Sequence, residues 1–138
     1  FVDTDGHILG PHRGLWWYTI GQRKGLGVSF GKPMFVRALR LAENQVILTE
    51  NQDLFAGGLV ANTPAWIDFA QLEKPLTCAV KIRYNASPAP AEIAPLADNR
   101  VRVVFQEPQR AVTPGQAAVF YDGDYVIGGG MIEQEWPL

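Results

Sequence analysis

The stretch EPQRAVTPGQAAVFYDGDYVIGGG, residues 107–130, decides the fold class, because it combines two turn signals with two apolar runs. Pro114-Gly115 predicts a type II turn, since proline presets φ at the first central position and glycine accepts a positive φ at the second. Residues 117–121 then predict a strand, Asp122-Gly123 a tight hairpin loop, and residues 125–127 the returning strand. The stretch therefore predicts part of a β-barrel.

Short apolar runs separated by turn residues continue through the rest of the chain. Residues 77–84, TCAVKIRY, alternate between apolar and polar side chains and predict a half-buried strand. Further strands are expected at 91–96, 101–105 and 131–136, with short apolar pieces at 59–61 and 66–69. Strands at such close and regular spacing predict a small closed barrel.

The segment before residue 58 predicts a smaller β unit. Residues 15–20, LWWYTI, are aromatic and β-branched and predict a strand. Residues 34–50 contain no Gly or Pro and partly fit a helix, but Val-Ile-Leu favours a hairpin of residues 35–41 and 46–50. Residues 51–58 predict one helical turn ending at Gly57-Gly58. We therefore expect an all-β protein with a small β domain at 1–57 and a barrel domain at 58–138.

Charge is unevenly distributed along the 138 residues. Twelve basic residues stand against fourteen acidic ones, and the net charge of −2 is not the bulk signature of a nucleic-acid-binding domain. Residues 1–40, however, hold six basic and two acidic residues, whereas residues 41–138 hold six and twelve. This asymmetry indicates either that the first segment faces a polyanion or that ordinary surface charge is unevenly spread.

Cysteine usage and hydropathy indicate the cellular environment of the protein. The single cysteine, Cys78, excludes an internal disulfide framework and favours a reducing, cytoplasmic environment. No apolar run approaches the ~20 residues that cross a bilayer, so we expect no membrane partner. The chain starts at Phe1 without a methionine, and we expect it to be a piece of a longer protein.

Side chains for catalysis or metal binding are sparse. His7 and His12 lie in a Gly/Pro-rich loop without a Cys or Glu at zinc spacing, so we expect exposed or locally hydrogen-bonded histidines and no metal site. Cys78 sits on the apolar face of its predicted strand, which indicates an inert thiol. Residues 128–130, GGG, predict a bulge or close backbone packing. We expect no catalytic residue and no cofactor in this chain.

Candidate binding residues are easier to find. Arg83 lies on the solvent face of its predicted strand with Tyr84 at the end, where a guanidinium can hold a phosphate and a phenol can stack. The alternative is that Tyr84 belongs to the core with Ile82 and that Arg83 is a solvated charge. Gln116, after the Pro114-Gly115 turn, has an amide able to donate and accept, although turn glutamines also simply face water.

Other loops offer further contacts. The loop at 21–27, GQRKGLG, allows close backbone approach at its three glycines and projects Arg23 and Lys24. Arg110 lies on a loop of the predicted barrel, where binding residues concentrate. Alternation along the predicted strand places at most one of Trp16 and Trp17 in the core. The other can stack on a base or sugar, or contact a neighbouring domain.

Three motifs carry a resemblance to a known family: GLWWYTIGQRKGLGV at 14–28, KIRY at 81–84 and EPQRAVTPGQAAVFYDGDYVIGGGMIE at 107–133. In this order they resemble the C-terminal half of bacterial tRNA-specific 2-thiouridylases, whose older name is tRNA (5-methylaminomethyl-2-thiouridylate)-methyltransferases. The resemblance covers essentially the whole chain.

This resemblance implies both a fold and a longer protein. It implies a small β central domain and a C-terminal six-stranded barrel like those of translation factors, preceded by an ATP-pyrophosphatase domain. That domain would use ATP with Mg²⁺ to adenylate the wobble uridine of tRNA, and would receive sulfur through two cysteines from a sulfur-relay donor protein. Neither of those cysteines is in this chain, whose single cysteine is Cys78.

Family similarity also implies tRNA-contacting residues. The Arg-Tyr of the KxRY motif and the Gln of TPGQ touch tRNA in the family, and they carry over to Arg83, Tyr84 and Gln116, with the anticodon arm as the expected partner. Asn85 stands where many relatives have a second arginine, which removes one possible phosphate contact. We therefore expect the tRNA-binding part of a tRNA-uridine 2-sulfurtransferase, with the chemistry in the missing domain.

Two other functions also fit the sequence. The acidic balance after residue 40 favours a protein-interaction barrel that braces the catalytic domain or docks the sulfur donor. A carbohydrate-binding β-module that uses Trp16 or Trp17 is the other alternative.

Overall fold

The computed structural model describes residues 1–136, and the chain divides into two compact units. The first unit is Phe1–Phe55, and the second begins at Ala56. Each unit has its own buried cluster of apolar side chains, which is what makes it compact. No helix within the described residues is long and apolar enough to span a bilayer.

The first unit is built on one hairpin. β1 (Phe35–Arg40) pairs antiparallel with β2 (Gln45–Thr49), and Asn44 in the connecting turn has a φ of 53°. Asparagine is one of the residues that tolerate this left-handed conformation. The predicted hairpin is confirmed, and a helix over residues 34–50 is excluded.

Loop residues supply much of the core of this unit. The hairpin contributes Val36, Val46 and Leu48, whereas segments outside the strands contribute Phe1, Tyr18, Leu26 and Met34. The ring of Phe1 meets the ring of Tyr18 edge to face, with centroids 5.2 Å apart. Burial of these side chains fixes the loops, because a short two-stranded hairpin alone is marginally stable.

The strand predicted at residues 15–20 is wrong. Leu15–Trp17 forms a short 3₁₀ turn, η1, which follows Gly14 at a φ of 119°. Trp16 and Trp17 are 90% and 67% exposed, so neither belongs to the core, while Leu15 and Tyr18 pack into it. The expected alternation fails because a tight turn after a glycine sets the side-chain directions here.

The helical turn predicted at 51–58 is shorter than expected. η2 (Asn51–Leu54) ends before the glycine pair, and β3 (Phe55–Trp66) runs straight through Gly57-Gly58. Gly58 has a steric reason to be in the strand: a Cβ there would lie 2.1 Å from the carbonyl oxygen of Val103. The glycine therefore marks close packing of two strands and not the end of an element.

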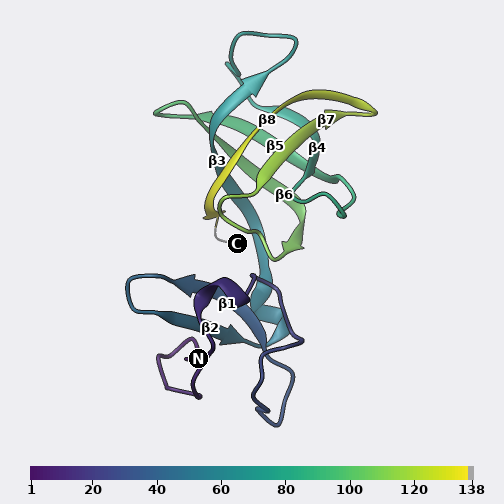
Figure 1. Ribbon diagram of the computed structural model, residues 1–138. Helices are drawn as coiled ribbons and strands as arrows, with labels where there is room; N and C mark the ends of the chain where they lie inside the picture. Colours follow the sequence, from purple (N-terminus) through teal and green to yellow (C-terminus); the bar gives the residue numbers. More distant parts are fainter. Residues whose placement is uncertain (137–138) are drawn as a thin grey trace. The chain divides into compact units, whose positions relative to one another are not determined.

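Six strands close the second unit into a barrel in the order β3-β6-β5-β4-β7-β8 (Figure 1). The strands after β3 are β4 (Leu76–Lys81), β5 (Ala89–Leu96), β6 (Arg100–Arg110), β7 (Ala117–Asp122) and β8 (Tyr125–Trp136). The predicted all-β class, a small β unit followed by a six-stranded barrel, is confirmed.

Several barrel strands are longer than predicted, and β6 extends the predicted 101–105 to Arg100–Arg110. β3 continues from the piece predicted at 59–61 through Thr63, at a φ of 43°, and ends at Trp66, so residues 67–69 of the second predicted piece lie outside the strand; its register against β8 shifts between Asn62 and Ala65. Residues 125–127 and 131–136 belong to one strand, β8. Bulges absorb turn-forming residues without ending the strand.

The β7–β8 hairpin loop is Gly123-Asp124, one residue later than predicted, with Gly123 at a φ of 59° in the first central position.

The three glycines at 128–130 pack against neighbouring backbone, as predicted. A Cβ on Gly128 would lie 2.6 Å from the Ala65 carbonyl oxygen, and a Cβ on Gly129 would lie 2.7 Å from that of Ala118. On Gly130 it would lie 2.9 Å from the carbonyl oxygen of Asn62. All three positions therefore require glycine for space.

The barrel core fixes the positions of the strand ends. Trp66 stacks on Phe120 with ring centroids 5.5 Å apart. The larger core side chains that are at most 1% exposed come from all six strands: Leu59, Val80, Ile93, Val101, Val103, Phe120 and Ile132. Because interiors of this kind are close-packed, the loops leave the barrel from rigid points.

Candidate nucleic-acid interface

One end of the barrel gathers the loops that carry most of the predicted binding residues. β4 ends at Lys81, which pairs with Val119 of β7. Since these strands are antiparallel, the segment that follows Lys81 runs beside the segment that precedes Val119. The loops at 82–88 and 111–116 therefore lie at the same end of the barrel.

Arg83 joins the first of these loops to the end of β6. The strand predicted through residue 84 ends earlier, because the backbone turns after the buried Ile82: the Ala86 N–H donates to the Arg83 carbonyl oxygen at 3.1 Å. The Arg83 guanidinium leaves the turn and donates from Nη2 to the carbonyl oxygen of Arg110 at 2.6 Å. Arg83 thereby connects loop 82–88 to the end of β6.

Arg83 keeps donors for a ligand. A guanidinium has five N–H groups, and the bond to the Arg110 carbonyl uses one of them. The residue is exposed, so the remaining N–H groups can donate to a phosphate in the bidentate manner that arginine favours. Because one N–H is already anchored to the barrel, less side-chain entropy is lost on binding.

Tyr84 projects from the same loop. Its side chain is 91% exposed, so the alternative that placed it in the core with Ile82 is wrong. Lys81 Nζ lies 5.4 Å from the centroid of the Tyr84 ring, a cation–π contact. Sequence reasoning missed Lys81, although its place on the polar face of KIRY was a signal. A cation and an open aromatic face therefore stand side by side.

Gln116 occupies the second loop. The Gln116 N–H donates to the Thr113 carbonyl oxygen at 3.2 Å, and Gly115 has a φ of 87°, as the predicted type II turn requires. Backbone bonds of 2.8 Å from Gly115 N–H to Ile132 oxygen and from Ile132 N–H to Gln116 oxygen hold the turn to β8. The Gln116 side chain is exposed on this fixed turn.

Four predicted residues thus share one end of the barrel: Arg83, Tyr84, Arg110 and Gln116. The hydrogen bond to Arg110 ties loop 82–88 to the end of β6, just before loop 111–116, and the β4–β7 register brings Tyr84 and Gln116 to the same end of neighbouring strands. Arg110, which was predicted to lie on a loop, is the last residue of β6: its carbonyl oxygen accepts the bond from Arg83, and its side chain is half-buried. We call Arg83, Tyr84 and Gln116 the barrel-end patch.

Arg23 and Lys24 lie in the first unit. Both are exposed in the glycine-rich loop, which is shaped by Gly25 and Gly27 at φ values of 75° and 76°. The Gln22 amide donates to the Lys24 carbonyl oxygen at 2.9 Å and closes the loop. A polar hollow of about 490 Å³ lies against it, with Arg23 and Lys32 on its wall. Lys32 Nζ donates to Glu50 Oε1 at 2.6 Å, so Arg23 is the cation at this hollow that has no acidic partner among the ion pairs of the described residues.

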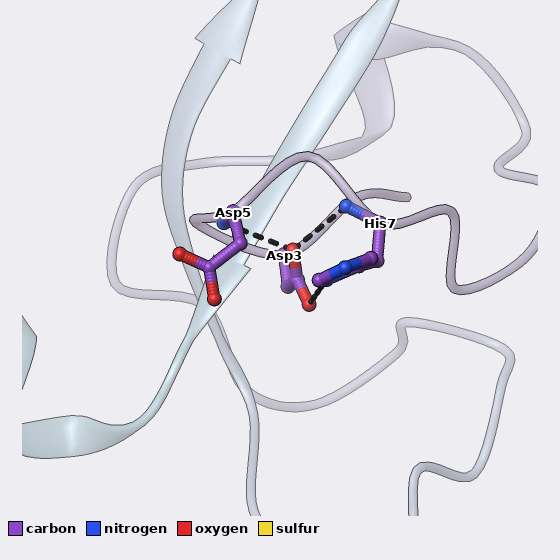
Figure 2. Close-up of side chains that lie close together, drawn as sticks. All are labelled: Asp3, Asp5 and His7. Atoms are coloured by element: carbon purple, nitrogen blue, oxygen red, sulfur yellow. Dashed lines mark hydrogen bonds and ion pairs between the residues drawn. The ribbon is translucent and has the colours of Figure 1, made fainter.

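His7 has local hydrogen-bond partners, as predicted, whereas half-buried His12 also bonds to Asn44, which is 32 residues away in the sequence. Asp3 Oδ1 accepts from the N–H groups of Asp5 and His7, and His7 Nδ1 lies 2.9 Å from Asp3 Oδ2 (Figure 2). His12 accepts from the Gly14 N–H at Nδ1, so its Nε2 donates to the Asn44 carbonyl oxygen at 2.7 Å. Both rings are therefore explained by the folding of their loops.

Asp3, Asp5 and His7 bring their ligand atoms within 4.8 Å of one another, and these are residue types that bind metal ions. Their hydrogen bonds form an Asx turn, which accounts for the grouping without a metal (Figure 2). The backbone bond from His7 lowers the pKa of Asp3, and the side-chain bond to Asp3 raises the pKa of His7. Each charge thereby stabilises the other.

Cys78 has the properties of a structural thiol. It is half-buried on β4 and packs against the barrel core. Burial, with a smaller effect from Asp122, raises its pKa to about 11. Because the thiolate is the nucleophilic form, this environment keeps the sulfur unreactive at neutral pH.

Comparison with known proteins places these features in a family. The family model for the aminomethyltransferase beta-barrel domain matches residues 56–132, and the model for the tRNA methyl transferase PRC-barrel domain matches residues 1–50. The chain belongs to the aminomethyltransferase beta-barrel domain family. Both matches follow the two units that the structure shows.

Individual relatives in this family are more specific. The tRNA-specific 2-thiouridylase MnmA of Clostridioides difficile (strain 630) is 52% identical over 134 residues, which is 97% of this chain and 37% of the relative. The protein of that name from Acetivibrio thermocellus is 53% identical over 133 residues, 96% of this chain and 37% of the relative. The one from Halothermothrix orenii is 48% identical over 135 residues, which is 98% of this chain and 38% of the relative. The resemblance to tRNA-specific 2-thiouridylases is confirmed.

The match covers only part of each relative. The chain spans just over a third of the length of these curated relatives. It is homologous to a part of proteins named as tRNA-modifying enzymes.

Proposed function

We propose that this chain is the tRNA-holding part of a tRNA-uridine 2-sulfurtransferase. The observation that supports it most is the barrel-end patch: three exposed polar or aromatic side chains on two loops at one end of the barrel, where Arg83 is bonded to the end of β6. In relatives named tRNA-specific 2-thiouridylase, a substrate tRNA must be held. Arg83 would take a backbone phosphate, Tyr84 would stack on a base or sugar, and Gln116 would hydrogen-bond a base edge or ribose.

The chemistry would take place outside these residues. We propose that an ATP-pyrophosphatase domain binds ATP with Mg²⁺ and activates the wobble uridine, and that a sulfur-relay donor protein supplies the sulfur, in the cytoplasm. Cys78, with its pKa raised to about 11, is a poor candidate for carrying that sulfur. The barrel and the first unit would position the anticodon arm, with Arg23, Lys24 and Arg110 as further contacts.

The first test is tRNA binding by Arg83→Ala, measured by fluorescence anisotropy over a range of salt concentrations. Loss of one phosphate contact should weaken binding and reduce the slope of log K against log salt by about 1, with little change in preference among tRNAs. Lys74→Ala is the matched control, because it removes one exposed positive charge from the loop before β4, at the other end of the barrel. Unchanged affinity and slope for Arg83→Ala would contradict the contact.

Arg83→Lys separates charge from geometry. Lysine keeps the positive charge but has no planar fork, so it should restore the salt slope and only part of the affinity. Thermal melting of each variant should be compared with the unsubstituted chain, because Arg83→Ala removes the bond to the Arg110 carbonyl and Arg83→Lys replaces its donor.

The second test concerns the reaction. The matching third of the Clostridioides difficile relative can be replaced by this chain, and 2-thiouridine in tRNA measured by mass spectrometry in cells that lack the enzyme. We expect the chimera to restore 2-thiouridine and Arg83→Ala to lower it. A chimera that folds and holds no 2-thiouridine activity would argue against the proposed role.

A second candidate is a protein-interaction barrel that braces the catalytic domain or docks the sulfur donor. It is favoured by the twelve acidic against six basic residues after position 40 and by the 80% exposure of Tyr125 next to the β7–β8 turn. Cross-linking distinguishes the two candidates. A docking module should give protein adducts through the barrel and none to tRNA, whereas the tRNA-holding role requires adducts between the barrel-end patch and tRNA.

A further inference from the structure

We infer that the first unit carries a second RNA-contacting surface, in which Trp16 and Trp17 stack on unpaired bases while Arg13, Arg23 and Lys24 hold the backbone. This inference rests on the proposed function, but it concerns other residues and another unit than the barrel-end patch. We call the five residues the Trp-turn surface.

The two indoles are open to a ligand. Trp16 is 90% and Trp17 is 67% exposed, and among the described residues no hydrogen bond or ring contact engages either indole. Two adjacent, largely exposed tryptophans are costly to leave in water, because each presents a large apolar surface. Such exposure indicates a surface that is covered by a partner.

The turn that carries them is fixed in place. The Trp17 N–H donates to the Gly14 carbonyl oxygen at 3.2 Å, and the Tyr18 N–H donates to that of Leu15 at 3.1 Å. Leu15 and Tyr18, on either side of the indoles, pack into the core of the first unit. The tryptophans are therefore presented on an anchored turn, so that stacking would cost little conformational entropy.

The surrounding charge selects the kind of partner. Residues 6–42 contain six basic residues and no Asp or Glu. Three of them flank the turn and the glycine-rich loop and are exposed: Arg13, Arg23 and Lys24. The Arg13 guanidinium reaches that loop, with Nη2 only 3.4 Å from where a Cβ on Gly27 would be.

A stretch of basic charge around exposed indoles matches single-stranded RNA. Such proteins combine cations along the backbone with aromatic rings on which bases stack. A surface that binds an ordinary protein face meets charges of both signs, whereas the charged residues nearest in sequence to the two indoles, Arg13, Arg23 and Lys24, are exposed and all positive. The unpaired nucleotides of a tRNA loop or bulge supply both phosphates and open base faces.

The test measures binding of the unsubstituted chain, Trp16→Ala, Trp17→Ala and their double variant to tRNA and to a short single-stranded RNA. Each base that stacks should be worth on the order of 5- to 100-fold in affinity. Trp16→Phe should retain part of the affinity because it keeps an aromatic face. Leu41→Ala is the control, since Leu41 is an exposed apolar residue of the same unit, 74% exposed, without a ring. Circular dichroism should show all variants folded, because the substituted side chains lie outside the core.

A fluorescence measurement tests stacking separately from affinity. Single-stranded RNA should quench the fluorescence of the unsubstituted chain, a duplex of equal length should quench it less, and the double variant should lose this difference. Equal quenching by both RNAs, or quenching that survives in the double variant, would contradict base stacking.

The outcomes separate this inference from the proposed function. If the unsubstituted chain does not bind tRNA, the proposed function fails. If binding depends on Arg83 but not on Trp16 or Trp17, the proposed function stands and the Trp-turn surface is wrong. If Trp16→Ala leaves RNA affinity unchanged and converts a self-associated chain to a monomer in analytical ultracentrifugation, the surface contacts protein instead.

Discussion

In the barrel, thirteen of the fifteen buried core residues lie on strands, whereas in the first unit four of the seven lie outside them. This difference determines whether a loop can carry binding residues without also contributing to the core. The barrel is held by its closed sheet, so its end loops can carry binding residues without also carrying the fold. In the first unit the loops are part of the core, so binding and stability are tied to the same segments.

The comparison predicts the largest loss of stability in the barrel. Phe120→Ala removes a fully buried ring that stacks on Trp66, and should lower the free energy of unfolding by about 3–5 kcal/mol. Chemical denaturation followed by circular dichroism measures it. Val126→Ala, at a β8 position that is 40% exposed, is the control and should change much less. A small effect of Phe120→Ala would mean that the barrel does not depend on this core.

The next prediction contrasts two loops. Leu26 lies in the glycine-rich loop of the first unit but is 6% exposed, so Leu26→Ala should cost about 2–5 kcal/mol, as for a strand residue. Gln116→Ala in a barrel loop should change stability by less than about 0.5 kcal/mol. An equal loss in free energy of unfolding for the two substitutions would contradict the idea that loops carry the core in the first unit but not in the barrel.

A third prediction concerns the glycines of β8. Gly128→Ala would place a Cβ 2.5 Å from the Trp66 ring and 2.6 Å from the Ala65 carbonyl oxygen, and should cost about 1–3 kcal/mol through overpacking. Met131→Ala, at an exposed position of the same strand, should cost less. Thermal unfolding of both variants is the measurement. A larger loss of stability for Gly128→Ala would show that the close approach to Trp66 and Ala65 is what requires glycine at this position.

A fourth prediction uses the sulfur of β4 to probe how closed the barrel is. With a pKa of about 11 instead of 9.0, the thiolate fraction of Cys78 at pH 8 should be roughly 100-fold below that of an ordinary cysteine. Alkylation followed by mass spectrometry should be correspondingly slow in the folded chain and fast in denaturant. Rapid alkylation of the folded chain would mean that β4 opens readily.

The smallest effect is expected in the Asx turn of the first unit. The bond to Asp3 raises the pKa of His7, so the contribution of this pair is present below the ordinary histidine pKa of about 6.5 and is lost as pH rises through the raised value. The lowered pKa of Asp3 means that it is also lost on strong acidification. An NMR titration should show the His7 pKa falling in Asp3→Asn, and falling less in Asp5→Asn. An equal fall of the His7 pKa in both variants would mean that nearby negative charge, and not the hydrogen bond to Asp3, raises it.

Local patterns predicted the fold class well and the ends of elements less well. The hairpin of β1 and β2 was predictable because residues 34–50 lack breakers and are β-rich in their second half. Leu15–Trp17 was not, because the burial of Leu15 and Tyr18 overrode strand propensity.

The barrel-end patch depended on information that local patterns do not hold. Arg83 and Gln116 are far apart in the chain, and they come to one end because β4 pairs with β7, which is not its neighbour in sequence. Alternation also extended the predicted strand through Tyr84, whereas the ladder with β7 ends at Lys81. The motifs identified the residues, and the topology placed them together.

The hairpin of the first unit has one more consequence, which concerns aggregation. An open sheet edge is a template for pairing with another chain. Here short bonds occupy both edges: Val2 exchanges backbone bonds with Val46 and Leu48 on β2, and Val36 on β1 does so with Gly21 and Gln22. The barrel solves the same problem by closing on itself. The Trp-containing and glycine-rich segments next to Val36 therefore also protect the hairpin, and loosening them would expose a strand to intermolecular pairing.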